Sequence, residues 1–140
     1  DQIPQVEALG WVPDLVTLDV GGNDVVMGQV NADEYTANMR QILRRLPERS
    51  YVGDVPWFAM IPFKGRSEAF TERVRPLIPE SGHVLLPLHE ISASPGPLKY
   101  HLWTAADFFH PNDAAYLAWS EAFIETIVDD GWLARLANQR

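Results

Sequence analysis

The stretch DLVTLDVGGND, residues 14–24, decides the fold class of this 140-residue chain. Residues 15–20 form a mostly apolar run of the length typical of a buried strand. Gly21 and Gly22 end the run and let the backbone turn sharply. Asn23 follows with a side-chain amide of the kind that stabilises a developing oxyanion. The stretch therefore predicts a buried strand followed by a tight turn, with Asn23 placed to bind a ligand.

A second motif, DFFHPN at residues 107–112, precedes a helix-like run. Asp107 and His110 are three residues apart, a spacing that suits a carboxylate orienting an imidazole general base. Pro111 suits the first turn of a helix, and Asn112 or Asp113 suits its cap. Helix-start chemistry thus explains the end of the motif, but it gives no reason for Asp107 and His110.

The periodicity of apolar residues predicts one layered α/β unit with three strands. None of the strands alternates cleanly, which favours a parallel sheet covered by helices on both faces. Loops after parallel strands share one sheet edge, so we expect residues 21–24 to meet the segment leading to His110 there. The predicted strands are residues 15–20, 55–61 and 84–88, and the predicted helices are residues 33–46, 67–78 and 112–128, with a helix end at residues 2–9.

Together the two motifs resemble blocks of the SGNH hydrolases, also called the GDSL esterase and lipase family. Gly21-x-Asn23-Asp24 resembles the block with the oxyanion-hole asparagine, and Asp107-x-x-His110-Pro111 resembles the block with the catalytic Asp and His. The resemblance implies a flavodoxin-like, three-layer α/β/α domain with a parallel sheet of five strands. Residues 1–140 would be the C-terminal part of one such domain and would supply the last three strands.

The resemblance also implies roles for individual residues and a substrate class. His110 would be the general base, Asp107 its orienting partner and Asn23 the oxyanion donor. Gly21, Gly22 and Asp24 would form the supporting loop, with Asp24 bonding backbone amides. The substrate would be a small-molecule carboxylic ester, cleaved through an acyl-enzyme with no metal or organic cofactor.

The family's Gly-Asp-Ser block, which bears the nucleophilic serine, does not occur in this sequence. We therefore expect an N-terminal segment or chain of the same protein to supply the serine, and the 140 residues alone to be inactive. The strand at 15–20 would otherwise keep an unpaired edge. Two alternatives are a non-catalytic binding module on the same fold and, less favoured, a flavodoxin-like domain, since residues 21–24 do not match a dinucleotide fingerprint. The serines lie in turns, caps or helix faces: Ser50, Ser67, Ser81, Ser92, Ser94 and Ser120.

Composition narrows the possible partners. The formal net charge of −8 disfavours a nucleic-acid surface, which needs clustered Lys and Arg. The arginines between residues 40 and 49 have helical spacing and suit a solvated face. No apolar stretch approaches the roughly 20 residues needed to span a bilayer, and no charged-then-apolar leader opens the sequence. With no cysteine in the sequence, the redox compartment stays open, so the chain could be cytoplasmic or secreted.

Histidines and aromatic residues outside the two motifs suggest little further chemistry. His83 and His89 bracket the third predicted strand, too far apart to share a metal ion, and His101 is expected on a surface loop. Trp57 and Phe58 fall in the second predicted strand and are expected in the core. Four aromatic residues on loops at the predicted active edge are candidates for pocket walls: Phe63, Trp103, Phe108 and Phe109.

Overall fold

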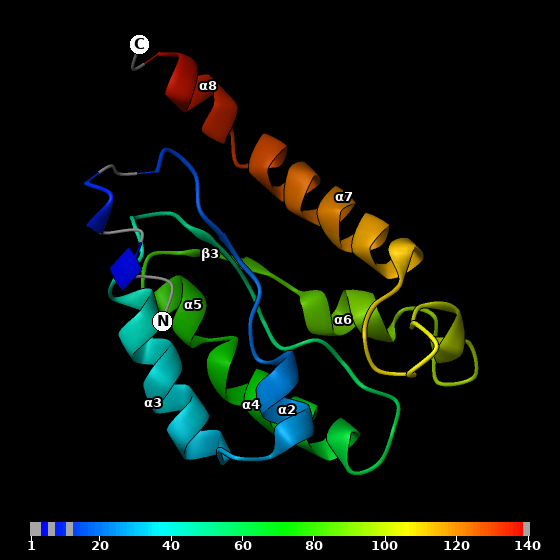
Figure 1. Ribbon diagram of the computed structural model, residues 1–140. Helices are drawn as coiled ribbons and strands as arrows, with labels where there is room; N and C mark the ends of the chain where they lie inside the picture. The colour runs from blue at the N-terminus through cyan, green and yellow to red at the C-terminus, as the bar shows by residue number, and fades with distance from the viewer. Residues whose placement is uncertain (1–3, 6–7, 11–12, 139–140) are drawn as a thin grey trace.

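The computed structural model describes residues 4–5, 8–10 and 13–138 and contains a three-stranded parallel sheet. Strands β1 (Thr17–Leu18), β2 (Tyr51–Gly53) and β3 (Val84–Leu86) lie side by side in chain order (Figure 1). β2 is the central strand and pairs in register with both neighbours. The predicted α/β class with a parallel sheet is confirmed.

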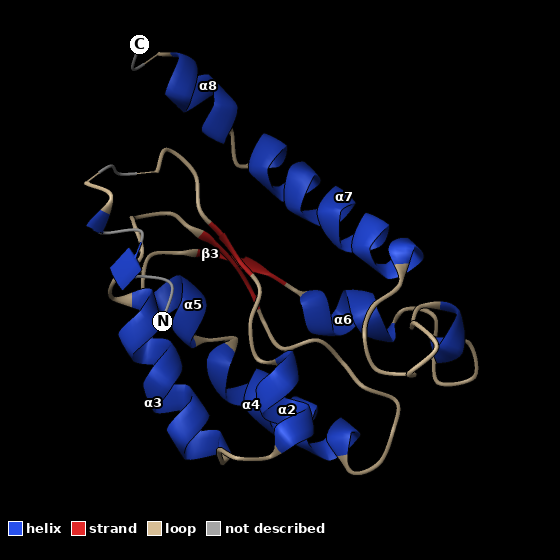
Figure 2. Cartoon of the chain, viewed as in Figure 1, coloured by secondary structure: helices blue, strands red, loops and turns tan. Residues whose placement is uncertain are grey.

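Helices cover both faces of the sheet, as Figure 2 shows. One face is covered by α2 (Gly22–Met27), α3 (Ala32–Leu43), α4 (Phe63–Val74) and α5 (Leu77–Glu80). The other face is covered by α6 (Leu88–Ala93) and the long α7 (Asp113–Asp129), which α8 (Trp132–Ala137) follows. A short 3₁₀ helix, η1 (Tyr100–Leu102), lies in the loop between α6 and α7. None of the helices within the described ranges is long and apolar enough to cross a membrane.

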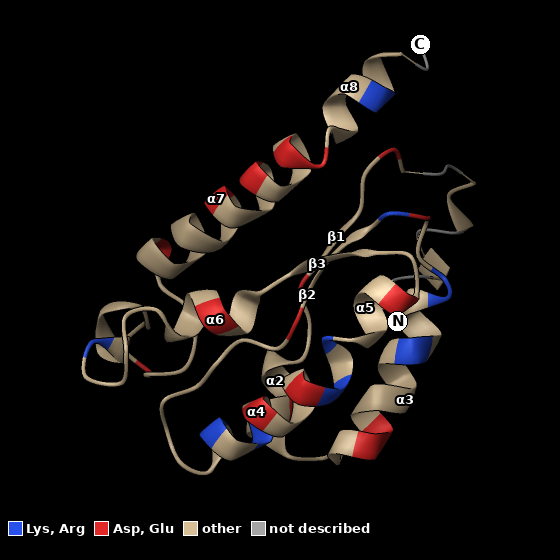
Figure 3. Ribbon diagram, turned by 180° about the vertical axis from the view of Figure 1, so that it is seen from behind, with Lys and Arg blue, Asp and Glu red and all other residues tan. Residues whose placement is uncertain are grey.

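Each face of the sheet packs its own hydrophobic cluster. The larger cluster lies under α2 to α5 and includes Met39, Val52 and Phe70. The smaller one joins Leu86 and Leu88 to Trp119 of α7. Acidic residues lie along the outer side of α7 (Figure 3). The three-layer arrangement therefore follows from two separate apolar faces on one sheet.

Asparagine caps define the N-terminal ends of α3 and α7. Asn31 accepts from the backbone N–H groups of Asp33 and Glu34, and the Glu34 carboxylate accepts from the Asn31 N–H, which completes a capping box. Asn112 caps α7 through its side-chain oxygen alone, which accepts from the backbone N–H groups of Ala114 and Ala115. The predicted helices at residues 33–46 and 112–128 are therefore present with shifted ends.

The second strand was predicted in the wrong place. β2 spans Tyr51–Gly53, and residues 55–61 form a loop. The Asp54 N–H still donates to the Leu86 carbonyl, but Pro56 has no N–H to continue the ladder. Two aromatic residues of this loop, Trp57 and Phe58, line a pocket.

Other boundaries differ by a few residues. The helix predicted at 67–78 starts earlier, as α4, and breaks near Pro76 before α5. β1 and β3 are both shorter than predicted. β3 ends before Pro87, which has no N–H to continue the ladder. Three short helices, α2, α6 and α8, were not predicted. A helix end was predicted at residues 2–9. Residues 4, 5 and 8 are helical and residue 9 is in a turn, while residues 2–3 and 6–7 lie outside the described residues.

Candidate active site

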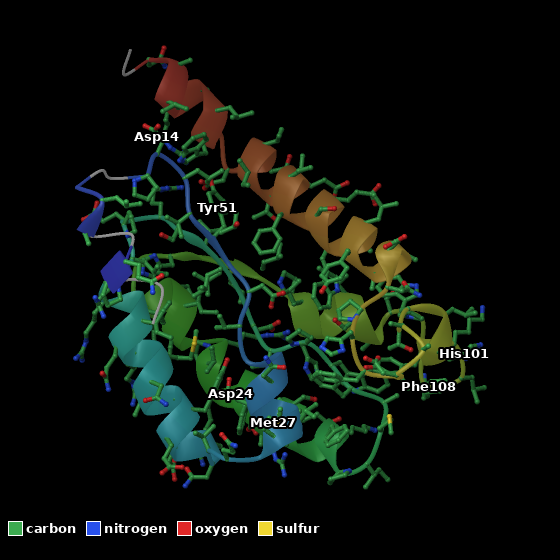
Figure 4. The ribbon with its side chains drawn as sticks, viewed as in Figure 1. Asp14, Asp24, Met27, Tyr51, His101 and Phe108 are labelled. Atoms are coloured by element: carbon green, nitrogen blue, oxygen red, sulfur yellow. The ribbon has the colours of Figure 1, made fainter. Side chains whose placement is uncertain are left out.

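A pocket of about 390 Å³ lies where the carboxyl ends of β1 and β2 meet the loop before α7. Residues 19–24, 56–58 and 109–111 line it, together with side chains of α6, η1 and α7. Figure 4 shows Asp24 at α2, and His101 with Phe108 on the loop at one end of the molecule. The expected meeting of residues 21–24 with His110 at this edge is thus observed.

The turn after β1 depends on the absence of a side chain at Gly21. Its φ of +106° lies in the left-handed region, and a Cβ there would overlap the Tyr35 hydroxyl and lie 3.2 Å from Val55 Cγ2. Tyr35 is held firmly, because it is buried, stacks on Phe70 at 4.5 Å and donates to the Val20 carbonyl. Gly22 has no such constraint, since a Cβ there would meet only Phe58 at 3.8 Å.

The turn presents Asn23 and Asp24 to the pocket from the first turn of α2. Asn23 is exposed, and within the described ranges its amide makes no hydrogen bond, so it is available to a ligand. Asp24 was expected to bond backbone amides of the loop; among the described residues its carboxylate makes no such bond. Burial raises the pKa of Tyr35, and the negative charge of Asp24 adds to this effect.

Asp107 orients the imidazole of His110. The Nδ1 atom of His110 lies 2.6 Å from Asp107 Oδ2, while Asp107 Oδ1 accepts from the backbone N–H groups of Phe109 (2.9 Å) and His110 (3.0 Å). These bonds, the one to the imidazole first, lower the pKa of Asp107 to about 2. The ionised carboxylate therefore favours a proton on Nδ1 and leaves Nε2 as the basic nitrogen.

The loop that bears His110 is anchored on both sides. The Ala105 N–H donates to the His110 carbonyl at 2.8 Å, and the Asn112 N–H donates to the Trp103 carbonyl at 3.1 Å. The Asn112 side chain donates to the carbonyls of Leu102 and Thr104 while its oxygen caps α7. A single residue therefore fixes the histidine loop to the start of the longest helix.

Aromatic rings form much of the pocket wall. Trp57 and Phe58 are buried as expected, but they lie on the loop after β2 and line the pocket. Phe58 stacks on Phe109 at 5.4 Å, and Trp103 also lines the pocket, as predicted. Two predicted wall residues do not line it, because Phe63 packs against Phe58 from α4, and Phe108 is 56% exposed.

Sequence reasoning missed Asp19, which also lines the pocket. Leu18 and Val20 pack into the larger cluster, so strand alternation places Asp19 on the opposite side, toward the pocket. Asp19 is exposed over the residue as a whole, yet the protein around its carboxyl group raises the pKa of Asp19 to about 6. This alternation was the signal in the sequence that could have identified it.

Further wall residues come from segments whose role the sequence did not reveal. Ser92 stands on the unpredicted α6, Tyr100 on η1, and Tyr116 and Trp119 on α7. Ser92 is buried, and its hydroxyl has no hydrogen-bond partner among the described residues. Among the described residues, no serine hydroxyl is hydrogen-bonded to His110.

The other histidines contact backbone or lie outside the pocket. The His83 Nε2 atom lies 2.9 Å from the Leu43 carbonyl oxygen, and His89 Nδ1 lies 3.1 Å from the Val55 carbonyl and from the Thr71 hydroxyl. His101 was expected on a surface loop; it is exposed and lies on η1. Within the ranges described, no three His, Asp or Glu side chains are grouped so as to hold a metal ion.

Comparison with known proteins gives one result that bears on identity. No curated protein matches the chain. The model of the GDSL-like Lipase/Acylhydrolase family matches residues 1–118. That match spans most of the sequence and includes both the turn with Asn23 and the loop with Asp107 and His110. The chain belongs to the GDSL-like lipase and acylhydrolase family.

Proposed function

We propose that this pocket hydrolyses carboxylic esters through an acyl-enzyme. The observation that supports this most strongly is the His110–Asp107 pair at 2.6 Å. His110 lines the pocket together with Asn23, whose amide has no hydrogen-bond partner among the described residues. Membership of an acylhydrolase family supports ester cleavage in general. The serine chemistry and the individual roles are our proposal.

The proposed reaction has two halves that use the same base. His110 Nε2 accepts the proton of a serine hydroxyl as its oxygen attacks the ester carbonyl, and then gives that proton to the leaving alcohol. Water next attacks the acyl-enzyme, His110 accepts its proton, and the serine recovers it as the acid departs. Asp107 stabilises the imidazolium, and the Asn23 amide donates to the tetrahedral oxyanion.

We infer that the serine belongs to a segment of the same protein outside the 140 residues. Among the described residues β1 pairs only with β2, so its outer edge is available to another strand. Leu117, Ile124 and Val128 are more than half exposed along α7, which offers an apolar face for an additional element.

Substitution of the three residues in the full-length protein tests the proposed roles. With a soluble chromogenic short-chain ester, His110→Ala and Asp107→Asn should each lower kcat by about 1,000-fold or more. Asn23→Ala should lower kcat by about 100-fold or more and change KM little, because its donor acts mainly in the transition state. His101→Ala is the matched control and should keep wild-type rates. Wild-type kcat in the His110 variant would exclude it as the base.

Covalent labelling locates the nucleophile. A fluorophosphonate should modify one serine of the full-length protein, and peptide mapping should place that serine outside residues 1–140. Ser92→Ala, which removes the one serine hydroxyl in the described pocket wall, should still be labelled. A label on Ser92 would show instead that this chain holds its own nucleophile.

A second candidate is a non-catalytic binding module on the same fold. The observation that favours it is the lack of a serine hydroxyl bonded to His110 in the described part of the chain. In this case the full-length protein would neither turn over esters nor react with the fluorophosphonate, yet non-hydrolysable ketone analogues of esters would still bind.

A further inference from the structure

Five large apolar side chains are exposed on the two loops beside the pocket. Ile61 is 88% exposed and Leu98 is 90% exposed, the highest values for large apolar residues in the described ranges. We call the full set the apolar rim: Met60, Ile61, Leu98, Leu102 and Phe108. Near-complete exposure of Ile61 and Leu98 means that neighbouring side chains scarcely touch them. Ile61 and Leu98 therefore project as separate tips, while the other three rim residues are about half exposed.

Ring contacts hold the two loops of the rim together. Phe58, on the loop after β2, stacks on Phe109 at 5.4 Å, and Trp57 meets Tyr100 edge to face at 5.6 Å. All four of these rings line the pocket. Each is within three residues of a member of the rim along the chain, so the two loops that carry the rim also carry part of the wall of the pocket that we assign to ester hydrolysis.

The two sequence stretches that carry four of the five rim residues are basic, whereas the whole chain is acidic. The chain has a net charge of −8, but residues 55–67 contain Lys64 and Arg66 and no acidic residue. Residues 91–106 contain Lys99 and again no acidic residue. Acidic residues border both stretches, and each has a partner: Asp54 and Glu90 pair with Arg75, and Asp107 is bonded to His110. Glu68 lies 3.9 Å from Lys64 and offsets part of its charge.

We propose that the apolar rim and its three basic neighbours, Lys64, Arg66 and Lys99, bind the protein to the surface of an anionic lipid layer. Exposed apolar tips gain free energy when they enter the boundary between headgroups and acyl chains. Lys and Arg beside them are attracted to anionic headgroups. A fluid lipid layer closes around separate tips, whereas a protein partner needs a continuous complementary face. The proposal concerns binding and does not depend on the proposed hydrolysis.

Vesicle partitioning of the full-length protein tests the proposal. Vesicles of phosphatidylcholine with about one third phosphatidylglycerol should bind the protein more tightly than pure phosphatidylcholine. Ile61→Ser with Leu98→Ser should weaken binding to the mixed vesicles at least tenfold. Lys64→Gln with Lys99→Gln should weaken it about tenfold on mixed vesicles and leave binding to pure phosphatidylcholine unchanged. Added salt should reproduce this second loss.

The chain offers matched controls at sites remote from the rim. Leu133→Ser removes an exposed leucine on α8, at the far end of the molecule (Figure 1). Arg40→Gln with Arg44→Gln removes two arginines at exposed positions, one on α3 and one at its C-cap. Each control should change partitioning less than twofold. Wild-type protein that ignores anionic vesicles, rim variants that bind like wild type, or equal losses in the controls would each overturn the proposal.

A label on the rim gives a second readout that needs no loss of binding. The 140 residues contain no cysteine, so Leu98→Cys provides one attachment point in this region for an environment-sensitive dye. Its fluorescence should rise several-fold and shift to the blue with anionic vesicles, while a dye at Leu133→Cys should not respond. An unresponsive dye at position 98 would contradict insertion of the tip. Ester turnover is measured separately, so failure of either proposal is visible without the other.

Discussion

At position 21 the backbone adopts a conformation that only glycine tolerates, and the next position has no such need. The φ of +106° at Gly21 is strained for any residue with a Cβ, and the space for a Cβ is filled by Tyr35. Gly22 has no positive φ, and a Cβ there would make only an ordinary contact with Phe58 at 3.8 Å. The two glycines look equivalent in the sequence, yet the structure assigns them unequal importance.

Alanine at each position separates these two cases. Gly21→Ala should lower the free energy of unfolding by about 2 kcal/mol or more, through both the strained φ and the overlap with the Tyr35 hydroxyl. Gly22→Ala should change it by less than about 1 kcal/mol. Tyr35→Phe removes the hydroxyl and should recover part of the loss in a Gly21→Ala background. Urea unfolding measures all four proteins, and equal losses at both glycines would refute this account of the turn.

Asp19 gives stability a dependence on pH. Its folded pKa of about 6 lies above the ordinary value of 3.8, so the folded protein binds this proton more tightly than the unfolded chain does. The resulting stabilisation is fully present below about pH 4 and is lost as pH rises through 6. Asp19→Asn removes the titration. The Tm of the variant relative to wild type should therefore rise between pH 4 and pH 7, and a constant difference would contradict the raised pKa.

At the scale of elements, α7 and the histidine loop are joined through Asn112. Its oxygen caps the helix, and its amide group holds the carbonyls of Leu102 and Thr104. The helix start and the position of His110 therefore depend on the same side chain. A substitution at position 112 that keeps the cap but removes the bonds to the two carbonyls should affect activity more than stability.

Two substitutions at position 112 test this coupling. Asn112→Ala should lower the free energy of unfolding by about 1 to 2 kcal/mol, because α7 loses its cap. Asn112→Asp keeps the capping oxygen but loses the amide donors, so it should cost less stability while still lowering kcat for ester hydrolysis. Denaturant unfolding and steady-state kinetics measure the two effects. Unchanged kcat in both variants would show that the loop is held without Asn112.

Much of this element plan could be predicted from the sequence, and the misses have physical reasons. Apolar periodicity predicted α3 and α7 because each has a long buried stripe. It misplaced β2, because residues 55–61 are apolar without belonging to the sheet: Pro56, Trp57 and Phe58 line the pocket, and Met60 and Ile61 are exposed. Strands of two or three residues leave too little pattern to set their ends. Asn23, Asp107 and His110 were found through motifs, and strand alternation could have identified Asp19. Ser92 and Trp119 reach the pocket only through tertiary packing.

At the scale of the whole molecule, a buried carboxylate ties the layers together. Asp54 follows β2 and is fully buried; it accepts from Arg75 at the end of α4 and from the His89 N–H at the start of α6. Arg75 also pairs with Glu90 of α6. Burial raises the pKa of Asp54 in spite of these bonds. The contact thus links helices of the two outer layers through the central strand.

Removal of the cation should leave this carboxylate buried without its charged partner. Arg75→Leu should lower the free energy of unfolding by about 3 kcal/mol, the lower end for breaking a buried pair, because the Arg75 side chain is 32% exposed. Arg73→Leu is the matched control on the same helix, where the pair with Asp33 is exposed, and should cost less than about 1 kcal/mol. Similar losses in the two variants, measured by urea unfolding, would show that the buried pair is not special.

The spatial order of the strands, β1, β2 and β3, is also the order in which a ribosome makes them. Each new strand can pair with the one synthesised just before it, so the sheet grows by short steps along the nascent chain. The residues of the pocket are synthesised far apart in time, because residues 19–24 emerge early from the ribosome and His110 emerges late. A growing chain can therefore form its sheet before the pocket is complete, and ester hydrolysis that uses His110, as we propose, would begin only after residue 110 has left the exit tunnel.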